Sequence, residues 1–306
     1  MADKKAGSNG RPKGGSSKNK GGVKRRPKNR SAKGTVITII VIIGVGIGVM
    51  VALQGGPKSS DSASPGAAAQ PNLVSATDLG KVTDVSPALV DAASQSHSTV
   101  QPPKPLPAST PPLTSNGKPE IVYIGAEYCP YCAAQRWALT QALSRFGTFT
   151  NVGETTSSST DVYADTPTFS YSGSKYTSPY VVFTPVEMKD RNGQPLDKPT
   201  AAQQALLAKY DAPPYVDASS KGAIPFLYIG GKYQQVGTSL NPQLLSGMSF
   251  SDITASIQDQ SSATGQSILG AANFLTASIC ETTGQKPADV CSAAGVTAAA
   301  QQLAAG

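Results

Sequence analysis

The amino-acid sequence predicts an α/β domain that follows a single transmembrane helix. Nineteen consecutive uncharged residues, Thr35–Leu53, have the length and composition of a membrane span. Two short segments rich in β-branched and aromatic residues, Ile121–Gly125 and Phe226–Ile229, have the composition of buried strands. Each is followed, directly or after a hairpin, by a longer stretch of helix-forming residues. We therefore expect helices to alternate with the strands of a sheet.

Residues 1–34 carry much of the positive charge of the chain. They hold twelve Lys/Arg and one acidic residue, which leaves fourteen basic and eighteen acidic residues in the remainder. Their Gly, Lys, Arg and Ser content, without apolar periodicity, predicts a disordered basic tail. Such a tail could contact nucleic acid or anionic lipid, but no aromatic residues interleave the charges. The positive-inside rule accounts for the charge, so we expect a cytoplasmic tail and no nucleic-acid partner.

The segment 35–53 decides the expected compartment. A cleaved signal peptide is an alternative to a permanent anchor, but the apolar stretch exceeds the usual length and a long basic tail precedes it. We therefore expect a single-pass protein of the cell membrane, held in the lipid bilayer by residues 35–53, with everything after Leu53 outside the cytoplasm. The four cysteines, an even number, suit a compartment in which disulfides persist.

A flexible linker and an N-terminal extension precede the core of the predicted extracytoplasmic domain, 72–306. Residues 54–71 are rich in Gly, Ser and Ala, which is typical of a flexible linker. The extension, 72–118, begins with apolar residues that suggest one or two short helices and ends in a proline-rich, extended connector. His97, the only histidine, lies in this polar extension, and we expect a solvated loop residue rather than a catalytic base or metal ligand.

Two cysteines, Cys129 and Cys132, lie where the first strand gives way to a helix. Helical spacing of apolar residues begins after Ala133 and continues to Phe146, with Gly147 expected as the C-terminal cap. The cysteines therefore fall on the first helical turn, where free N–H groups and the helix dipole favour a thiolate.

The spacing of this pair predicts reversible disulfide chemistry. We expect Cys129 to be the nucleophile because it is nearest the helix start. Pro130, just inside the helix, costs no backbone hydrogen bond, and the three-residue spacing brings Cys132 close enough to form a disulfide as the resolving cysteine.

The string IVYIGAEYCPYC, Ile121–Cys132, resembles the strand-to-active-site segment of thioredoxin-like proteins, and CPYC is a variant associated with glutaredoxins. The longer string GKPEIVYIGAEYCPYCAAQRWALTQALSRFGTF, Gly117–Phe149, is similar to a family of membrane-anchored actinobacterial and archaeal proteins catalogued as a domain of unknown function. We expect that family to cover most of the chain from about Asn72. The resemblance implies a thioredoxin-like fold and supplies no established substrate.

Two positions depart from the thioredoxin pattern. Tyr123 occupies the position, six residues before Cys129, at which thioredoxins carry a buried carboxylate, so that proton acceptor is missing. Tyr131 replaces the histidine that strongly oxidising periplasmic enzymes place between their cysteines. From these two departures we expect an intermediate reduction potential, nearer that of glutaredoxins, at roughly −200 to −230 mV, than that of the strongest oxidants, at about −120 mV.

The segment AIPFLYIGGKY, Ala223–Tyr233, is the second landmark. The resemblance implies that Pro225 follows a cis peptide bond and faces the dithiol, with the closing hairpin of the sheet behind it. The backbone of Ile224 is then expected to bind a substrate polypeptide by strand-like hydrogen bonds. Pro130 and Tyr131 are expected to contribute to the same substrate-binding surface.

The ninety-two residues between Cys132 and Pro225 exceed what a minimal thioredoxin needs, so we expect an insertion within 148–222. Its composition, rich in Ser, Thr and Tyr, favours β-structure. The segments expected to be regular are strands within Phe149–Thr160, Thr166–Tyr171 and Tyr180–Lys189, and a helix over Thr200–Tyr210.

The C-terminal part, 251–306, has the Ala-rich composition of helices and contains Cys280 and Cys291. Ten residues separate these cysteines, which is not the CxxC spacing of a redox pair. We expect a structural disulfide, contributing roughly 2–3 kcal/mol in the chain-entropy model.

These observations favour a membrane-anchored extracytoplasmic thiol–disulfide oxidoreductase without metal or cofactor. Its substrates would be protein thiols and disulfides, and a membrane redox partner would recycle the dithiol. One alternative is a Cys₄ zinc site formed by both cysteine pairs. Another is a non-enzymatic binding or assembly module in which both disulfides are structural. Peroxide reduction is less supported, because Ala126 stands where related peroxidases carry a threonine.

Overall fold

The computed structural model describes residues 72–305 of the chain. The predicted tail 1–34, transmembrane helix 35–53 and linker 54–71 lie outside the described residues. Within the described part, no helix combines the length and apolar character that a membrane crossing requires. The described part is a mixed α/β structure, as the sequence predicted at this level.

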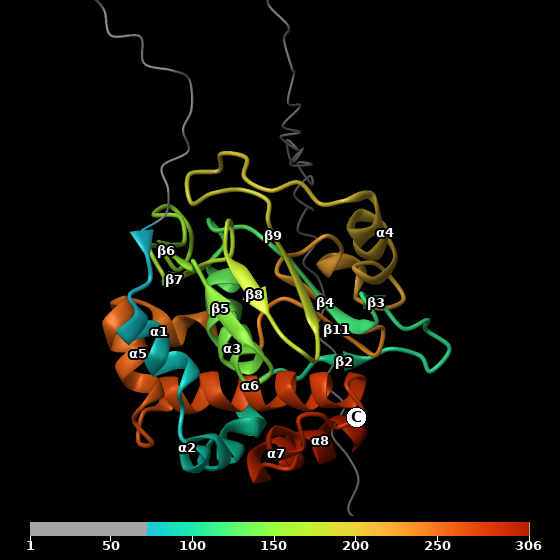
Figure 1. The fold of residues 1–306 in the computed structure, drawn as a ribbon. Helices are drawn as coiled ribbons and strands as arrows, with labels where there is room; N and C mark the ends of the chain where they lie inside the picture. The colour runs from blue at the N-terminus through green and yellow to red at the C-terminus, as the bar shows by residue number, and fades with distance from the viewer. Residues whose placement is uncertain (1–71, 306) are drawn as a thin grey trace, which may run out of the picture. The chain divides into compact units, whose positions relative to one another are not determined.

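The central sheet is built around the strand that leads to the cysteines (Figure 1). Its strands are β2 (Lys104–Pro105), β3 (Thr114–Ser115), β4 (Lys118–Gly125), β9 (Val182–Glu187), β10 (Phe226–Ile229) and β11 (Tyr233–Val236). β9 runs parallel to β4, whereas β10 pairs antiparallel with β4 on its other side, and β11 and β2 continue the sheet outward. The short β3 pairs with the beginning of β4. The main spatial order is therefore β9–β4–β10–β11–β2.

Helices cover both faces of this sheet. Successive side chains of β4 point to opposite faces, and each set packs into its own apolar cluster. Ile121 and Tyr123 pack into the larger cluster, which includes residues of α3 (Pro130–Ser144) and α6 (Ala263–Thr282). Val122 and Ile124 pack into the smaller one, against α4 (Ala201–Tyr210). α3 and α4 therefore lie on opposite faces of β4.

The insertion follows α3 as two small antiparallel sheets. It contains β5 (Thr148–Thr150), β6 (Gly153–Thr156), β7 (Pro167–Ser170) and β8 (Lys175–Thr177). β6 pairs with β7 and with β1 (Asn72–Leu73) of the N-terminal extension, whereas β5 pairs with β8. The indole N–H of Trp137 donates to the carbonyl of Pro167 at 2.9 Å, and the Thr168 hydroxyl donates to that of Ala133 at 2.9 Å. These bonds hold the insertion against α3.

The N-terminal extension and the C-terminal part pack together around α6. Besides α6 they comprise α1 (Ala76–Thr83), α2 (Pro87–Ala92), the 3₁₀ helices η1 (Ala93–Thr99) and η3 (Pro242–Leu245), α5 (Phe250–Ile257), α7 (Ala288–Cys291) and α8 (Ala294–Ala305); η2 (Ala218–Ser220) precedes β10. Five helices begin after a Ser or Thr whose hydroxyl accepts the N–H three residues on, namely Ser75, Ser86, Thr200, Ser249 and Ser262.

Two expectations about local structure are wrong. His97 is buried rather than solvated, because η1 packs against α6 and places its ring 4.7 Å from that of Phe274. Burial lowers the pKa of His97. Gly147 is not the helix cap, since α3 ends at Ser144 with Arg145 in that role. A side chain at Gly147 would overlap the carbonyl of Thr177, so close packing explains this glycine.

Candidate active site

Cys129 is itself the N-cap of α3. β4 ends at Gly125, and the chain reaches α3 through Ala126–Tyr128. The Cys129 sulfur accepts the backbone N–H of Cys132 at 3.2 Å, the bond that a Ser or Asp oxygen makes at other helix starts. Pro130 occupies the first helical turn, where its missing N–H leaves no bond unmade. The helix start therefore fixes the position of the first sulfur.

The two cysteines differ in accessibility. Both are free thiols in this structure. Cys129 is 6% exposed, whereas Cys132 is fully buried beneath it. Tyr131, between them, is an exposed aromatic residue at 42%. Of the two cysteines, Cys129 alone has exposed surface, so it is the one that an incoming sulfur would meet first.

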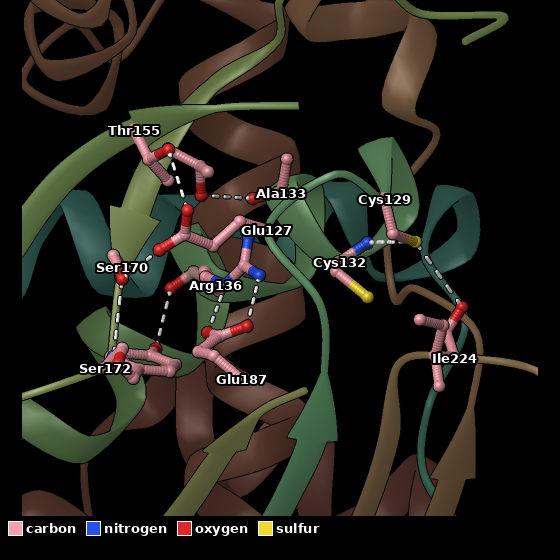
Figure 2. Close-up of polar contacts among 12 residues, drawn as sticks. Glu127, Cys129, Cys132, Ala133, Arg136, Thr155, Ser170, Ser172, Glu187 and Ile224 are labelled. Carbon is pink, nitrogen blue, oxygen red and sulfur yellow. Dashed lines mark hydrogen bonds and ion pairs between the residues drawn. The ribbon is translucent and has the colours of Figure 1, made fainter. Parts of the chain in front are cut away.

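The structure brings Cys129 together with the second landmark of the sequence. The Ile224–Pro225 peptide bond is cis and immediately precedes β10. The Cys129 thiol donates to the Ile224 carbonyl at 3.7 Å, although the two residues are 95 positions apart in the sequence (Figure 2). The sulfur of α3 and the backbone before β10 thus meet at one place on the domain.

The two thiols have opposite pKa perturbations. The pKa of Cys129 is lowered, first by a hydrogen bond from the Cys132 side chain and then by the Cys132 N–H and the Arg136 charge, against the opposing effect of burial. Burial raises the pKa of Cys132 well above its ordinary value. Cys129 therefore ionises first, and Cys132 stays protonated longer.

A fully buried ion pair lies one helical turn beyond Cys132 and was not foreseen from the sequence. Arg136 Nε donates to Glu187 Oε1 at 2.7 Å, and Arg136 Nη2 donates to Oε2 at 2.6 Å (Figure 2). Both side chains have no exposed surface. Glu187 ends β9, opposite Gly125 of β4. The one available signal was an arginine four residues after Cys132, but nothing in the sequence identified its partner.

Two further polar residues lie beside the dithiol. The hydroxyl of Tyr123, where the sequence lacks the expected carboxylate, is buried without a hydrogen-bond partner among the described residues. Burial raises its pKa well above the ordinary value of tyrosine. Glu127, two residues before Cys129, is buried and accepts hydrogen bonds from Ser170 and Thr155 of the insertion. The insertion therefore supplies polar partners to the loop that carries Cys129.

Surface hollows flank the start of α3 on two sides. Tyr131 lines one, of about 370 Å³, together with Lys104 and the end of β11. Tyr128 lines another, of about 510 Å³, with Lys189 and Arg191. The predicted substrate-binding residue Tyr131 thus lines a surface recess, whereas Pro130 is buried.

Cys280 and Cys291 form a separate disulfide. They join the last part of α6 to the end of α7, with 5.7 Å between their Cα atoms. In the part of the chain that the structure describes, no group of three or more His, Cys, Asp or Glu residues is arranged to hold a metal ion. A four-cysteine zinc site would need the sulfurs of both pairs in one place, and the structure instead bonds Cys280 to Cys291.

The fold and this site define an α/β domain with a CxxC dithiol at the start of a helix, placed against a proline-containing loop. The chain belongs to the family described as Domain of unknown function (DUF929), whose model matches residues 104–281. The match includes Cys129, Cys132 and Pro225, but it begins later than the expected Asn72 and ends before Cys291. No curated protein and no solved structure matches the chain.

Proposed function

We propose that this protein is a membrane-anchored, extracytoplasmic thiol–disulfide oxidoreductase with a thioredoxin-like fold. The observation that carries the proposal is the arrangement of the two thiols. The Cys129 sulfur is held at the start of α3 with a lowered pKa and contacts the Ile224 carbonyl, while Cys132 lies directly behind it. This is the arrangement required for nucleophilic attack followed by intramolecular resolution.

The order of the elements supports a thioredoxin-like fold. Strand β4, helix α3, the parallel strand β9, helix α4, the antiparallel hairpin β10–β11 and helix α6 follow one another along the chain. Pro225 immediately precedes β10 and follows a cis peptide bond, as the resemblance implies. The sheets β1–β6–β7 and β5–β8 are then the insertion between α3 and β9.

The proposed reaction needs no group beyond the two thiols and the substrate. The Cys129 thiolate attacks a substrate disulfide, forming a mixed disulfide and releasing one substrate sulfur as a thiolate that takes up a proton. Cys132 then loses its proton and attacks Cys129, which forms the Cys129–Cys132 disulfide and releases the second substrate thiol. Two electrons pass from the protein to the substrate, and the reverse sequence oxidises a substrate dithiol.

The backbone at Ile224 is the proposed binding element for an extended substrate segment. Its carbonyl already faces the Cys129 sulfur, so a polypeptide placed alongside would bring its own sulfur to the same point. Residues 35–53 would hold the domain at the bilayer, close to a membrane redox partner that recycles the dithiol. Protein thiols and disulfides are the proposed substrates.

The proposal is tested by trapping. In cells that express the full-length chain, the C132S variant cannot resolve a mixed disulfide, so substrates should accumulate on Cys129 and be released by reductant. The C129S/C132S double variant is the matched control and should trap none. If C132S accumulates no more mixed disulfides than this control, the dithiol is not catalytic and the non-enzymatic module becomes the better explanation.

A further inference from the structure

The buried polar residues behind the dithiol have no role in the reaction as written above. A fully buried ion pair such as Arg136–Glu187 is not a general source of stability, because apolar residues of similar size often serve equally well. Tyr123 likewise places a hydroxyl in the core without a hydrogen-bond partner among the described residues, which is usually unfavourable. Both features therefore call for an explanation at the neighbouring cysteine.

Tyr123 and Cys132 meet at a single glycine. A Cβ built on Gly125 would overlap the Tyr123 hydroxyl and would lie 3.1 Å from the Cys132 sulfur. The hydroxyl and the sulfur thus border the same small space, which the absence of a side chain at Gly125 keeps open. The hydroxyl makes no hydrogen bond among the described residues, to this sulfur or to any other group, so its hydrogen is available to a thiolate that forms at Cys132.

Arg136 supplies positive charge to the same place. It follows Cys132 by one helical turn, and its guanidinium carbon lies 5.8 Å from the centre of the Tyr123 ring. Its Nη1 group has no partner within the described part of the chain. The Arg136 charge lowers the pKa of Cys132, although burial has the larger, opposite effect.

The resolving step is the one that needs such groups. Cys132 is fully buried and must lose its proton before it can attack Cys129. A buried thiolate is costly unless a donor or a positive charge faces it. Glu187 holds Arg136 in place through hydrogen bonds to Nε and Nη2. The third guanidinium nitrogen, Nη1, has no hydrogen-bond partner among the described residues.

We propose that Tyr123 and Arg136 stabilise the thiolate of Cys132 during resolution of the mixed disulfide, Tyr123 by a hydrogen bond from its hydroxyl group and Arg136 by its charge. The inference rests on the proposed function. Cys132 loses its proton to solvent, and an electron pair of the Cys132 sulfur then forms the bond to Cys129 Sγ. At the same time the bond between Cys129 and the substrate sulfur breaks, which leaves a substrate thiolate that is protonated from solvent. Tyr123 remains a neutral phenol throughout.

The effect can be isolated with a probe that needs no biological substrate. Reduced full-length protein is mixed with dithiobis(nitrobenzoate), which forms a mixed disulfide at Cys129 and releases one coloured thiolate. Attack by Cys132 then releases a second. The rate of this second phase, followed against pH, measures the ionisation of Cys132, and the C132S variant shows the first phase alone.

Tyr123→Phe should slow the second phase about tenfold at neutral pH and raise its pH midpoint by about one unit, because a donor to the thiolate is lost. Replacing the ion pair with the R136M/E187M double variant should shift the midpoint in the same direction. The matched control is Tyr171→Phe, which removes a buried hydroxyl that bonds the Thr140 hydroxyl and the backbone carbonyl of Arg136 but makes no bond to Cys132. It should leave the second phase within about twofold of wild type.

The pH profile must be read with the neighbouring groups in mind. The titratable or charged groups that act on Cys132 are Cys129 and Arg136 of α3, Tyr123 of β4 and Tyr128 of the connecting loop. Behind them, Glu187 pairs with Arg136, Glu127 acts on Glu187, and the ring of Tyr171 packs edge-on against that of Tyr123. Tyr123→Phe leaves all the others in place, so a shifted midpoint in that variant reports on the hydroxyl.

Three outcomes would overturn the inference. The first is an unchanged rate and midpoint in Tyr123→Phe. The second is equal slowing by Tyr123→Phe and Tyr171→Phe, which would indicate a general packing effect. The third is a wild-type protein that releases only the first thiolate. This last result would contradict the proposed function itself, so the two failures are distinguishable.

Discussion

Replacing Arg136 by methionine should destabilise the fold in a way that depends on pH. The change removes the cation and leaves Glu187 in a site with no exposed surface. Methionine fills a similar space, so the main effect is the loss of charge pairing rather than a cavity.

The expected size follows from the geometry of the pair. Two short charge-assisted bonds, at 2.7 and 2.6 Å, satisfy the Glu187 carboxylate. Removing one partner of a buried pair typically costs about 3–5 kcal/mol, because the other charge is left buried and uncompensated. The R136M/E187M double variant removes both charges and should recover most of that loss.

The pH dependence has a defined sign. Burial raises the pKa of Glu187, and Arg136 opposes this effect, so removal of Arg136 raises that pKa further. A carboxyl whose pKa is higher in the folded state than in the unfolded state destabilises the fold when it is ionised. The loss in R136M should therefore be full above the folded-state pKa of Glu187 and should shrink as pH falls and the carboxyl takes up its proton.

Trp137 provides the assay. It is the only tryptophan, it is fully buried, and its ring packs against those of Phe169 and Phe250. Urea unfolding followed by its fluorescence gives the free energy of unfolding at each pH. A loss below about 1 kcal/mol at neutral pH, or a double variant no more stable than R136M, would refute the reasoning.

Two other predictions concern stability. Asp211 is buried, neither of its carboxylate oxygens has a hydrogen-bond partner in the described chain, and burial raises its pKa to about 6. Its ionised form therefore destabilises the fold above that pH, so Asp211→Asn should raise the free energy of unfolding by roughly 1–2 kcal/mol near pH 8 and by much less near pH 4. An equal gain at both pH values in urea titrations would contradict this. Replacing Cys280 and Cys291 together by alanine should cost roughly 2–3 kcal/mol under oxidising conditions, because the unfolded chain loses a closed loop. Reductant should bring the wild-type protein close to the variant in the same titration, and a variant as stable as the oxidised parent would argue against a structural role.

The features that the sequence predicts well are those with a local cause. β-branched and aromatic composition defines β4 and β10, and threonine capping defines the start of α4. The start of α3 at Pro130 follows from the CPYC string alone. The mixed α/β class and the membership of a family of unknown function follow from the same strings.

The features that the sequence does not show depend on distant partners. β1, β2 and β3 have two residues each, too few for a pattern, and exist because longer strands pair with them. From the sequence alone, Arg136 would be expected to be a solvated surface charge, because its partner Glu187 lies 51 residues further along the chain. The sequence shows that Tyr123 replaces a carboxylate and that Glu127 lies two residues before Cys129. It does not show the bonds of Glu127 to the insertion, and Glu187 reaches the site only because β9 pairs with β4.

The short strand β1 has a consequence for any force applied to the chain. Asn72 and Leu73 pair with β6, and Val74 donates to the carbonyl of Val152, so the described domain begins at the insertion rather than at the central sheet. A pull from the preceding residues would load these few contacts first. The β1–β6 pairing would break, one residue after another, before the tension reached the helix that carries the dithiol.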